Sequence, residues 1–332
     1  MDFVTLEAEE FAYAEPAEVL PGVQRVVAEN PSKFTYRGTG TYIIGDRDVA
    51  VIDPGPRLDA HRDALEQALE GRSVRSILVT HCHADHSPLA DWLRTETGAP
   101  TFAFGPHAGA VEEWDIGSLP EDFGRPPASD PAAPGETEPD GAEPKVEEST
   151  DTEFSPDVAV RTGDVVFAAD GLNMLALHTP GHTSNHTCFS LAGPDTGNVL
   201  FTGDHVMGWS TTVVSPPDGD MGAYMESLRL VAGRNDDVAI PTHGAPIPNP
   251  ARYVTQLVAH RLERERQVLD AVRRGLTTIP EMVTELYAAV RVELHRPAGA
   301  SVLGHLVKLV DDELISIESG VRPRLDSVFS AR

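Results

Sequence analysis

The sequence is poor in features that would mark a secreted or membrane protein. It has two cysteines in 332 residues, Cys82 and Cys188, which excludes a disulfide framework and fits a reducing compartment. No run of about 18 apolar residues is present, so no membrane-spanning helix is expected. The first residues are acidic and lack the basic flank and apolar core of a signal peptide. We therefore expect a cytoplasmic protein with no membrane partner.

Basic residues are also scarce. The chain has 26 Lys and Arg against 52 Asp and Glu, a net charge of −26. Residues 252–332 hold 12 basic and 11 acidic residues, so the excess of acid lies in the first 251 residues. A negative surface repels phosphate backbones and anionic membranes at long range. This lowers the expectation of nucleic-acid binding without excluding it.

Strand-like runs alternate with amphipathic helices through the first 250 residues. This alternation predicts a layered α/β domain over residues 1–250. The second helix is expected to begin with Ser87 as N-cap and Pro88 as its first residue. Strands are predicted at residues 23–29, 38–44, 49–53, 76–80, 100–104, 158–161, 164–168, 172–178, 186–191, 198–204 and 238–243, and helices at 61–70 and 88–97.

An acidic, proline-rich stretch interrupts this domain at about residues 118–157. Residues 130–157 contain ten acidic residues and five prolines against one lysine, Lys145. Such a segment buries too little apolar surface to offset its ordering entropy. We interpret it as a disordered or loosely held surface insertion.

The last part of the chain, residues 251–332, is predicted to form a separate module. Helices are predicted at residues 251–274, 278–290 and 299–309, followed by a strand at 314–318. Helices followed by strands predict a winged-helix-like domain. This domain could cover one wall of a substrate cleft or form the surface of a homodimer.

Metal-type side chains follow four separate apolar strands. Three histidines and an aspartate lie within residues 81–86, directly after one strand, and later strands end near His182, Asp204 and His243. One such placement could be accidental, but four predict a metal site. The predicted ligands are His81, His83, Asp85, His86, His182, Asp204 and His243.

This ligand set predicts a catalytic rather than a structural metal site. A structural zinc site is usually closed and often rich in thiolates, whereas five imidazoles and two carboxylates leave positions open. Two metals about 3.5–4 Å apart can hold a hydroxide between them, a nucleophile that exists near neutral pH. Asp85 and Asp204 are the carboxylates expected to act in catalysis, with Asp204 bridging through its two oxygens. We expect two Zn²⁺ per chain, although the same ligands serve iron and manganese.

Several other residues are candidates for supporting roles. Asp53 ends a buried strand and either makes a turn or accepts a hydrogen bond from a metal ligand. His186 and His205 lie beside ligand loops and could support a metal ligand or shuttle a proton. His178 and His107 are weaker candidates. The loop after Asp204 carries three candidate substrate contacts, Met207, Trp209 and Ser210, although Trp209 could equally well pack the loop. Both cysteines are expected to point into packing.

Residues 81–86 match the HxHxDH signature of the metallo-β-lactamase fold, and the motifs around His182, Asp204 and His243 follow in the right order. The resemblance covers about residues 22–250 and implies a four-layer αββα sandwich with the metals at one edge. It implies that His81, His83 and His182 bind one metal. It further implies that Asp85, His86 and His243 bind the other, with Asp204 as the bridge and Asp53 beside them.

The carboxylate at Asp204 narrows the subgroup. Many zinc β-lactamases have a cysteine there, so the resemblance is to glyoxalase II and the broader hydrolases. The C-terminal part resembles the beta-lactamase-like protein 2 group, which includes single-strand RNA endonucleases. We therefore expect a dinuclear zinc hydrolase acting on a small ester, thioester or lactone. The alternatives are a single-strand endoribonuclease, with RNA as partner, and a non-hydrolytic metal-binding or redox module.

Overall fold

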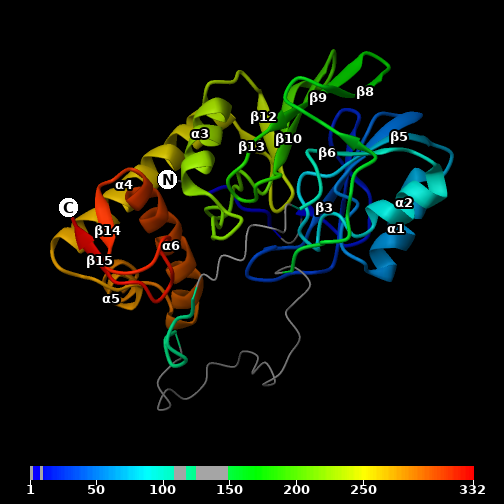
Figure 1. Cartoon of the computed structure of the whole chain (residues 1–332). Coiled ribbons are helices and arrows are strands. Elements are labelled where there is room, and N and C mark those ends of the chain that lie inside the picture. Colours follow the sequence, from blue (N-terminus) through cyan, green and yellow to red (C-terminus); the bar gives the residue numbers. More distant parts are fainter. Residues whose placement is uncertain (1–2, 8–9, 108–116, 125–148) are drawn as a thin grey trace.

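Two β-sheets face each other in the N-terminal part of the chain, and helices cover the outer side of each (Figure 1). The computed structural model describes residues 3–7, 10–107, 117–124 and 149–332. The first sheet has the order β1-β2-β3-β4-β5-β6-β7, antiparallel up to β4 and parallel from β4 onward. Its strands are β1 (Ala17–Leu20), β2 (Val23–Val27), β3 (Gly40–Ile44), β4 (Asp48–Ile52), β5 (Ser73–Leu78), β6 (Thr101–Ala103) and β7 (Val158–Ala159).

The second sheet has the order β13-β12-β11-β10-β9-β8. Its neighbours are antiparallel except for β11 and β12, which run parallel. Its strands are β8 (Val165–Ala169), β9 (Leu172–His178), β10 (Thr187–Gly193), β11 (Gly197–Gly203), β12 (Val238–Pro241) and β13 (Ile247–Pro248). Runs of β-branched and aromatic residues suit strands that are buried on both faces.

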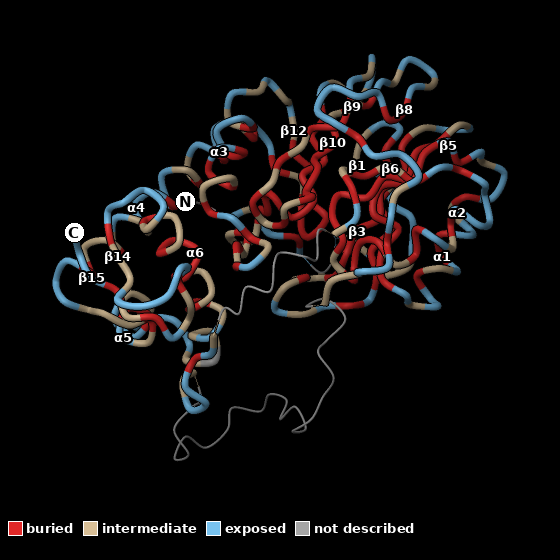
Figure 2. Tube along the Cα trace, in the orientation of Figure 1, coloured by how far each residue is buried: buried red, intermediate tan, exposed pale blue. Residues whose placement is uncertain are grey.

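Three apolar layers hold the sandwich together. Between the sheets, a core that includes Tyr42, Phe189 and Phe201 is almost fully buried (Figure 2). Outside the first sheet lie α1 (Asp59–Leu69) and α2 (Ala90–Thr97), and outside the second lie α3 (Met221–Ala232) and α4 (Pro250–Arg273). The predicted αββα architecture is therefore confirmed.

The C-terminal domain has its own core. It consists of α5 (Ile279–Leu286), a 3-10 turn (Val292–Leu294), α6 (His295–Asp311), and a hairpin of β14 (Ile315–Ile317) and β15 (Phe329–Ala331). The second half of α4 packs into this core, whereas its first half packs on the second sheet. The helix therefore joins the two domains, and none of the helices in the described part of the chain is long and apolar enough to cross a membrane.

Some element boundaries differ from the prediction. α2 begins at Ala90 after Leu89 because the Ser87 hydroxyl donates to Asp151 (2.7 Å) instead of capping the helix. α5 ends at Leu286 rather than residue 290, and α6 begins at His295 rather than residue 299. Helix α3 was not predicted, although Asp220 caps it by accepting from the Ala223 amide (2.9 Å).

Both described ends of the acidic insertion are packed rather than loosely held. At its start, Leu119 is buried in the C-terminal core, and Arg296 donates to the carbonyls of Pro120 and Phe123. At its end, Phe154 is buried against the first sheet, and Asp157 accepts from the Thr101 amide. The prediction was wrong for these ends because their few apolar and capping side chains find partners; residues 125–148 lie outside the described part of the chain.

Candidate metal centre

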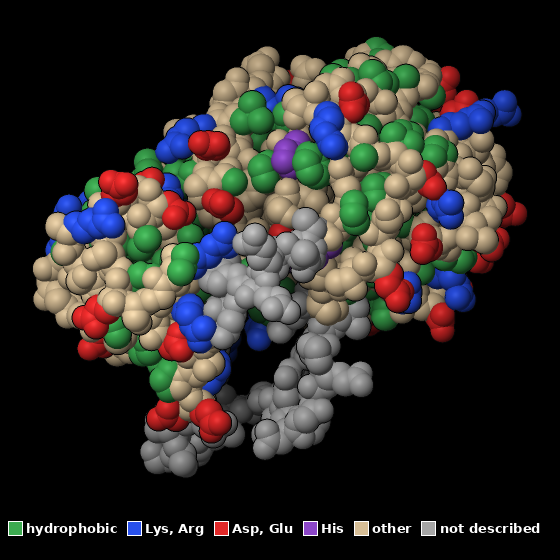
Figure 3. Space-filling view, in the orientation of Figure 1, with side chains coloured by type: hydrophobic (Ala, Val, Ile, Leu, Met, Phe, Trp, Pro, Cys, Tyr) green, Lys and Arg blue, Asp and Glu red, His purple; other side chains and the backbone are tan. Residues whose placement is uncertain are grey.

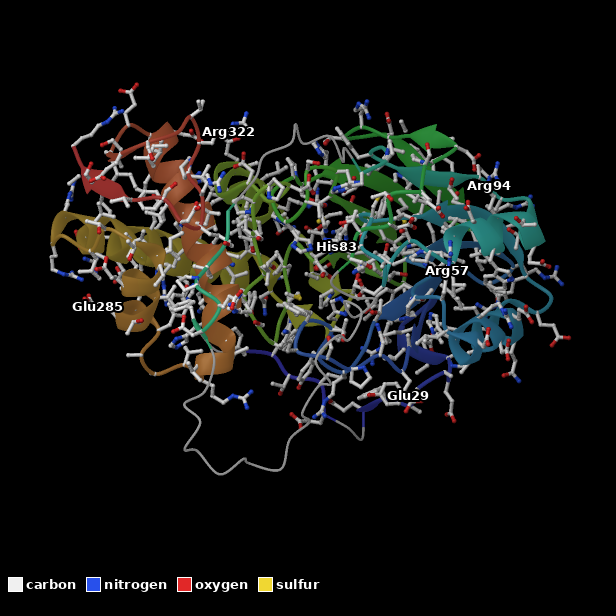
Figure 4. The ribbon with its side chains drawn as sticks, turned by 60° about the horizontal axis from the view of Figure 1, so that its bottom comes forward. Glu29, Arg57, His83, Arg94, Glu285 and Arg322 are labelled. Carbon is white, nitrogen blue, oxygen red and sulfur yellow. The ribbon has the colours of Figure 1, made fainter. Side chains whose placement is uncertain are left out.

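The loops after β5, β9, β11 and β12 bring the seven predicted ligands together. In Figure 4, His83 lies between the strands of the N-terminal domain, residues 1–250, and the C-terminal helices. Three groups of side chains have ligand atoms within 4.8 Å of one another. They are His81, His83 and His182; His81, His86 and Asp204; and Asp85, His86 and His243.

The first group consists of three imidazoles. Nδ1 of His83 lies 2.9 Å from Nε2 of His81 and 3.2 Å from Nε2 of His182. Burial lowers the pKa of His83 to about 3, and burial together with neighbouring histidines lowers the pKa of His81 well below its ordinary value. These imidazoles are therefore neutral near pH 7, which is the form that binds a metal.

The group of Asp85, His86 and His243 mixes imidazoles with a carboxylate. The Oδ2 atom of Asp85 lies 3.3 Å from Nε2 of both His86 and His243. Burial disfavours a proton on His243, but Asp204 and Asp85 outweigh it and raise the pKa of His243 to about 10. Burial also disfavours a proton on His86, but three carboxylates outweigh it and raise the pKa of His86. This pocket attracts positive charge, and a divalent cation would compete with those protons.

Asp204 lies between the group of three imidazoles and the group of Asp85, His86 and His243. Its Oδ2 is 3.8 Å from Nε2 of His182, and its Oδ1 is 3.3 Å from Nε2 of His243. Burial disfavours ionisation, but His243 and His86 outweigh it and keep the pKa of Asp204 well below its ordinary value. One carboxylate oxygen therefore faces each group.

Two buried atoms at this centre make no satisfactory hydrogen bond: Nε2 of His86 and Oδ1 of Asp204. Leaving such atoms unpaired in a protein interior costs about 1–3 kcal/mol each. Both are lone-pair donors of the kind that bind zinc, iron or manganese. The residues at this centre therefore fit divalent metal ions.

Asp53 orients several residues of the centre through hydrogen bonds. It is fully buried, and its carboxylate accepts hydrogen bonds from the Thr80 amide (2.8 Å), the Thr80 hydroxyl (2.8 Å), His86 Nδ1 (2.8 Å) and the Thr242 hydroxyl (3.0 Å). Thr80 and Thr242 directly precede His81 and His243. Of the two roles considered for Asp53, the structure therefore has the one in which it contacts a predicted ligand.

Other predicted ligands are oriented by groups that the sequence did not single out. Nδ1 of His182 contacts the Val213 carbonyl (2.7 Å), and Nδ1 of His243 contacts the Gly38 carbonyl (3.2 Å). The Thr39 hydroxyl donates to Asp85 (2.8 Å). When Nδ1 donates to a carbonyl, Nε2 keeps its lone pair for a metal. A threonine beside a strand end was the only sequence signal for any of these contacts.

The remaining histidines have distinct surroundings. His186 accepts from the Asp204 amide through Nε2 (3.2 Å), whereas His205 is buried against the Tyr224 ring without a side-chain hydrogen bond of good geometry. His178 stacks on Phe104, and His107 lines the cleft in front of the centre. The two cysteines are buried.

A cleft of about 460 Å³ opens in front of the centre. Of the three substrate-loop candidates, Met207 lines it. Trp209 instead stacks on Tyr36, with ring centroids 4.8 Å apart, and the Ser210 hydroxyl is directed at the Thr211 carbonyl. These two side chains are therefore engaged outside the lining of the cleft.

Comparisons with known proteins agree with this geometry. The family model of the metallo-beta-lactamase superfamily matches residues 36–243, and that of the beta-lactamase associated winged helix domain matches residues 278–321. An atrochrysone carboxyl ACP thioesterase from Paecilomyces divaricatus is 31% identical over 77% of this chain and 66% of its own length. Another, from Aspergillus chevalieri, is 28% identical over 90% of this chain and 84% of its own length.

Solved structures give the same fold. A beta-lactamase domain protein from Burkholderia ambifaria superposes with a TM-score of 0.73 at 21% identity, over 99% of this chain and 97% of that one. A metallo-beta-lactamase family protein from Thermus thermophilus has a TM-score of 0.66 at 25% identity, over 95% of this chain and 100% of that one. With the family match over most of the catalytic domain, this chain belongs to the metallo-β-lactamase superfamily and is a hydrolase of it.

Proposed function

We propose that this protein hydrolyses a small acyl thioester with two divalent metal ions, zinc being the expected metal. One observation carries the dinuclear assignment: Asp204 directs one oxygen at His182 and the other at His243, 3.8 and 3.3 Å away. A carboxylate between two ligand groups is suited to bridging two metals. Supporting evidence for the thioester is the name shared by two similar proteins, each an ACP thioesterase.

In this proposal His81, His83 and His182 hold one ion, and Asp85, His86 and His243 hold the other. Bound divalent ions lower the pKa of water and polarise a carbonyl, which is the chemistry that acyl hydrolysis needs. The chain supplies the orientation. Asp53 fixes the His86 ring, Thr39 fixes the Asp85 carboxylate, and the Val213 carbonyl fixes the His182 ring.

A thioester makes modest demands on the rest of the cleft. A cysteine thiol has a pKa near 8.5, so a sulfur leaving group of this kind can depart as a thiolate without a dedicated proton donor. An amide leaving group would need one. This difference supports a thioester among the acyl compounds that the site could accept.

The proposal is tested with the purified protein and a panel of thioesters, with and without EDTA. Wild type should hydrolyse at least one thioester, lose that activity in EDTA and regain it with Zn²⁺, and carry about two metals per chain by elemental analysis. His182→Ala and Asp85→Ala should lower turnover at least about a hundredfold and reduce the bound metal. His178→Ala, a nearby histidine outside the ligand groups, should change neither. Full activity in both ligand variants would sink the assignment.

Zinc, the cytoplasmic location and the homodimer stay predictions. X-ray fluorescence of the purified protein separates zinc from the iron expected of a redox module. Incubation with single-stranded RNA tests the nuclease alternative, which also requires binding that weakens steeply with salt. On the face drawn in Figure 3, basic and acidic side chains are interspersed over both domains.

A further inference from the structure

The cleft in front of the metal centre is walled by both domains. On one side lie the predicted ligands, among them His83 and Asp204, and on the other lie Pro297 and Ala300 of α6. Residues 213 and 215–219 and the side chains of Phe34 and Met207 complete most of the lining. A cleft of this size suits a small ligand rather than a flat macromolecular surface.

α6 is held closely against the loop that forms this wall. A Cβ atom added to Gly304 would lie 2.9 Å from the Val214 carbonyl oxygen, so the helix backbone lies directly against the loop. Pro297, Ala300 and Gly304 are spaced three and four residues apart, so they share one face of the helix. The C-terminal domain therefore supports the loop around Val214.

Hydrogen bonds connect the same loop to the metal centre. The Val213 carbonyl contacts His182 Nδ1 (2.7 Å), and the Thr212 hydroxyl donates to the Asp204 carbonyl (2.8 Å). From the other side, the buried Arg261 of α4 donates to the Thr212 carbonyl. An acyl group bound at this loop would therefore lie next to both the predicted metal ligands and the C-terminal domain.

Away from the predicted metal ligands, the lining selects against anions. Among the described residues that line this part of the cleft, none is Lys or Arg, whereas Asp218 is acidic. Asp218 is engaged with the Ser184 amide (3.1 Å), and its Oδ1 is buried without a hydrogen bond. An anionic end of the acyl chain that reached this wall, away from the metal ions, would therefore be desolvated without a cationic partner, which is costly.

The wall that faces the ligands is apolar, with Val213, Pro216 and Pro217 on the loop and Pro297 and Ala300 on α6. Burying methylene groups on such a wall stabilises a bound chain. We propose that α6 and the loop at residues 213–217 form the seat of the acyl group, and that this group is uncharged and apolar. This inference rests on the proposed thioester hydrolysis and assigns acyl specificity to the C-terminal domain.

The test uses full-length, zinc-loaded protein and neutral N-acetylcysteamine thioesters, so that the thiol part stays constant. Wild type should favour octanoyl over acetyl, and butanoyl over succinyl, by at least about tenfold in kcat/KM. Ala300→Trp should lower kcat/KM for octanoyl at least about tenfold while acetyl stays within about threefold, and Ala300→Leu should be intermediate. Retained acetyl hydrolysis reports that each variant is folded.

Asp311→Trp is the matched control, because this exposed residue lies about 16 Å further along the same helix. This variant should leave the preference for octanoyl over acetyl and the preference for butanoyl over succinyl unchanged. Equal losses for acetyl and octanoyl in Ala300→Trp, or hydrolysis of succinyl as fast as butanoyl, would overturn the acyl seat and leave thioester hydrolysis intact. A wild type that hydrolyses none of these thioesters would overturn the proposed function as well.

Discussion

Nδ1 of His86 donates to the Asp53 carboxylate over 2.8 Å, and neither side chain is exposed to solvent. The two residues come from different loops, 33 positions apart in the chain. The contact points Nε2 of His86 toward Asp85 and Asp204. The same carboxylate also holds Thr80 and Thr242, which directly precede His81 and His243.

Asp53→Asn should weaken metal binding. The amide nitrogen of Asn cannot accept a hydrogen bond, so at least one of the four donors around Asp53 loses its acceptor. Loss of such support for a metal ligand typically costs about 10–100-fold in metal affinity. The measurement is titration of metal-free protein with Zn²⁺ against a competing chelator. Asp48→Asn, an exposed carboxylate paired with Arg75 on the same sheet, should bind zinc like wild type; an unchanged affinity in Asp53→Asn would contradict the role of the contact.

Gly181→Ala should destabilise the fold and displace His182. Gly181 has φ +142°, and an added Cβ would overlap the backbone of Tyr224 in α3. Backbone strain and overpacking together should cost about 3 kcal/mol or more. Urea unfolding measures this loss. Gly71→Ala is the control, since Gly71 has φ +74° with open space around it and should lose only about 1–2 kcal/mol. Equal losses in the two variants would mean that the contact with Tyr224 is unimportant.

Stability should fall at acid pH partly through His61. This side chain is buried beside Thr41 and the Pro54 carbonyl, and burial lowers the pKa of His61 to about 4. The unfolded chain, with a pKa near 6.5, binds the proton first, so the contribution is fully present above pH 6.5 and is lost as the pH falls toward 4. Between pH 7.5 and pH 5 the loss should be about 2 kcal/mol.

Comparing urea unfolding of metal-free wild type and His61→Gln at these two pH values isolates this contribution. Other buried histidines titrate in both proteins and cancel in the difference. The variant should therefore lose about 2 kcal/mol less than wild type on acidification. A loss of the same size in both proteins would show that His61 is not buried in its neutral form.

The two thiols should be unreactive in the native protein. Burial raises the pKa of both Cys82 and Cys188 to about 12, so the reactive thiolate is scarce at pH 8. Ellman's reagent should detect no fast-reacting thiol in native protein and both thiols in guanidinium chloride. A thiol that reacts within seconds at pH 8 in native protein would be inconsistent with this burial.

Much of the fold could be predicted because its strands are coded locally. Short apolar runs such as residues 172–178 coincide with an observed strand, β9 (Leu172–His178). Boundaries that depend on tertiary partners were less predictable. Serine often caps a helix, but the Ser87 hydroxyl donates to Asp151, 64 positions away. Likewise, the described ends of the acidic insertion are ordered by contacts with Arg296 and the first sheet.

The residues that could hold metals were identified from the order of residue types along the chain. Histidine and aspartate side chains at the ends of apolar strands can bind a metal in any fold that brings those strand ends together. The orientation of each side chain could not be predicted, because it depends on single hydrogen bonds from distant segments, such as His182 to Val213 and Asp85 to Thr39. The tertiary structure also decided that α6 lines the cleft, because no local pattern records which face of a helix meets a loop some 90 residues away.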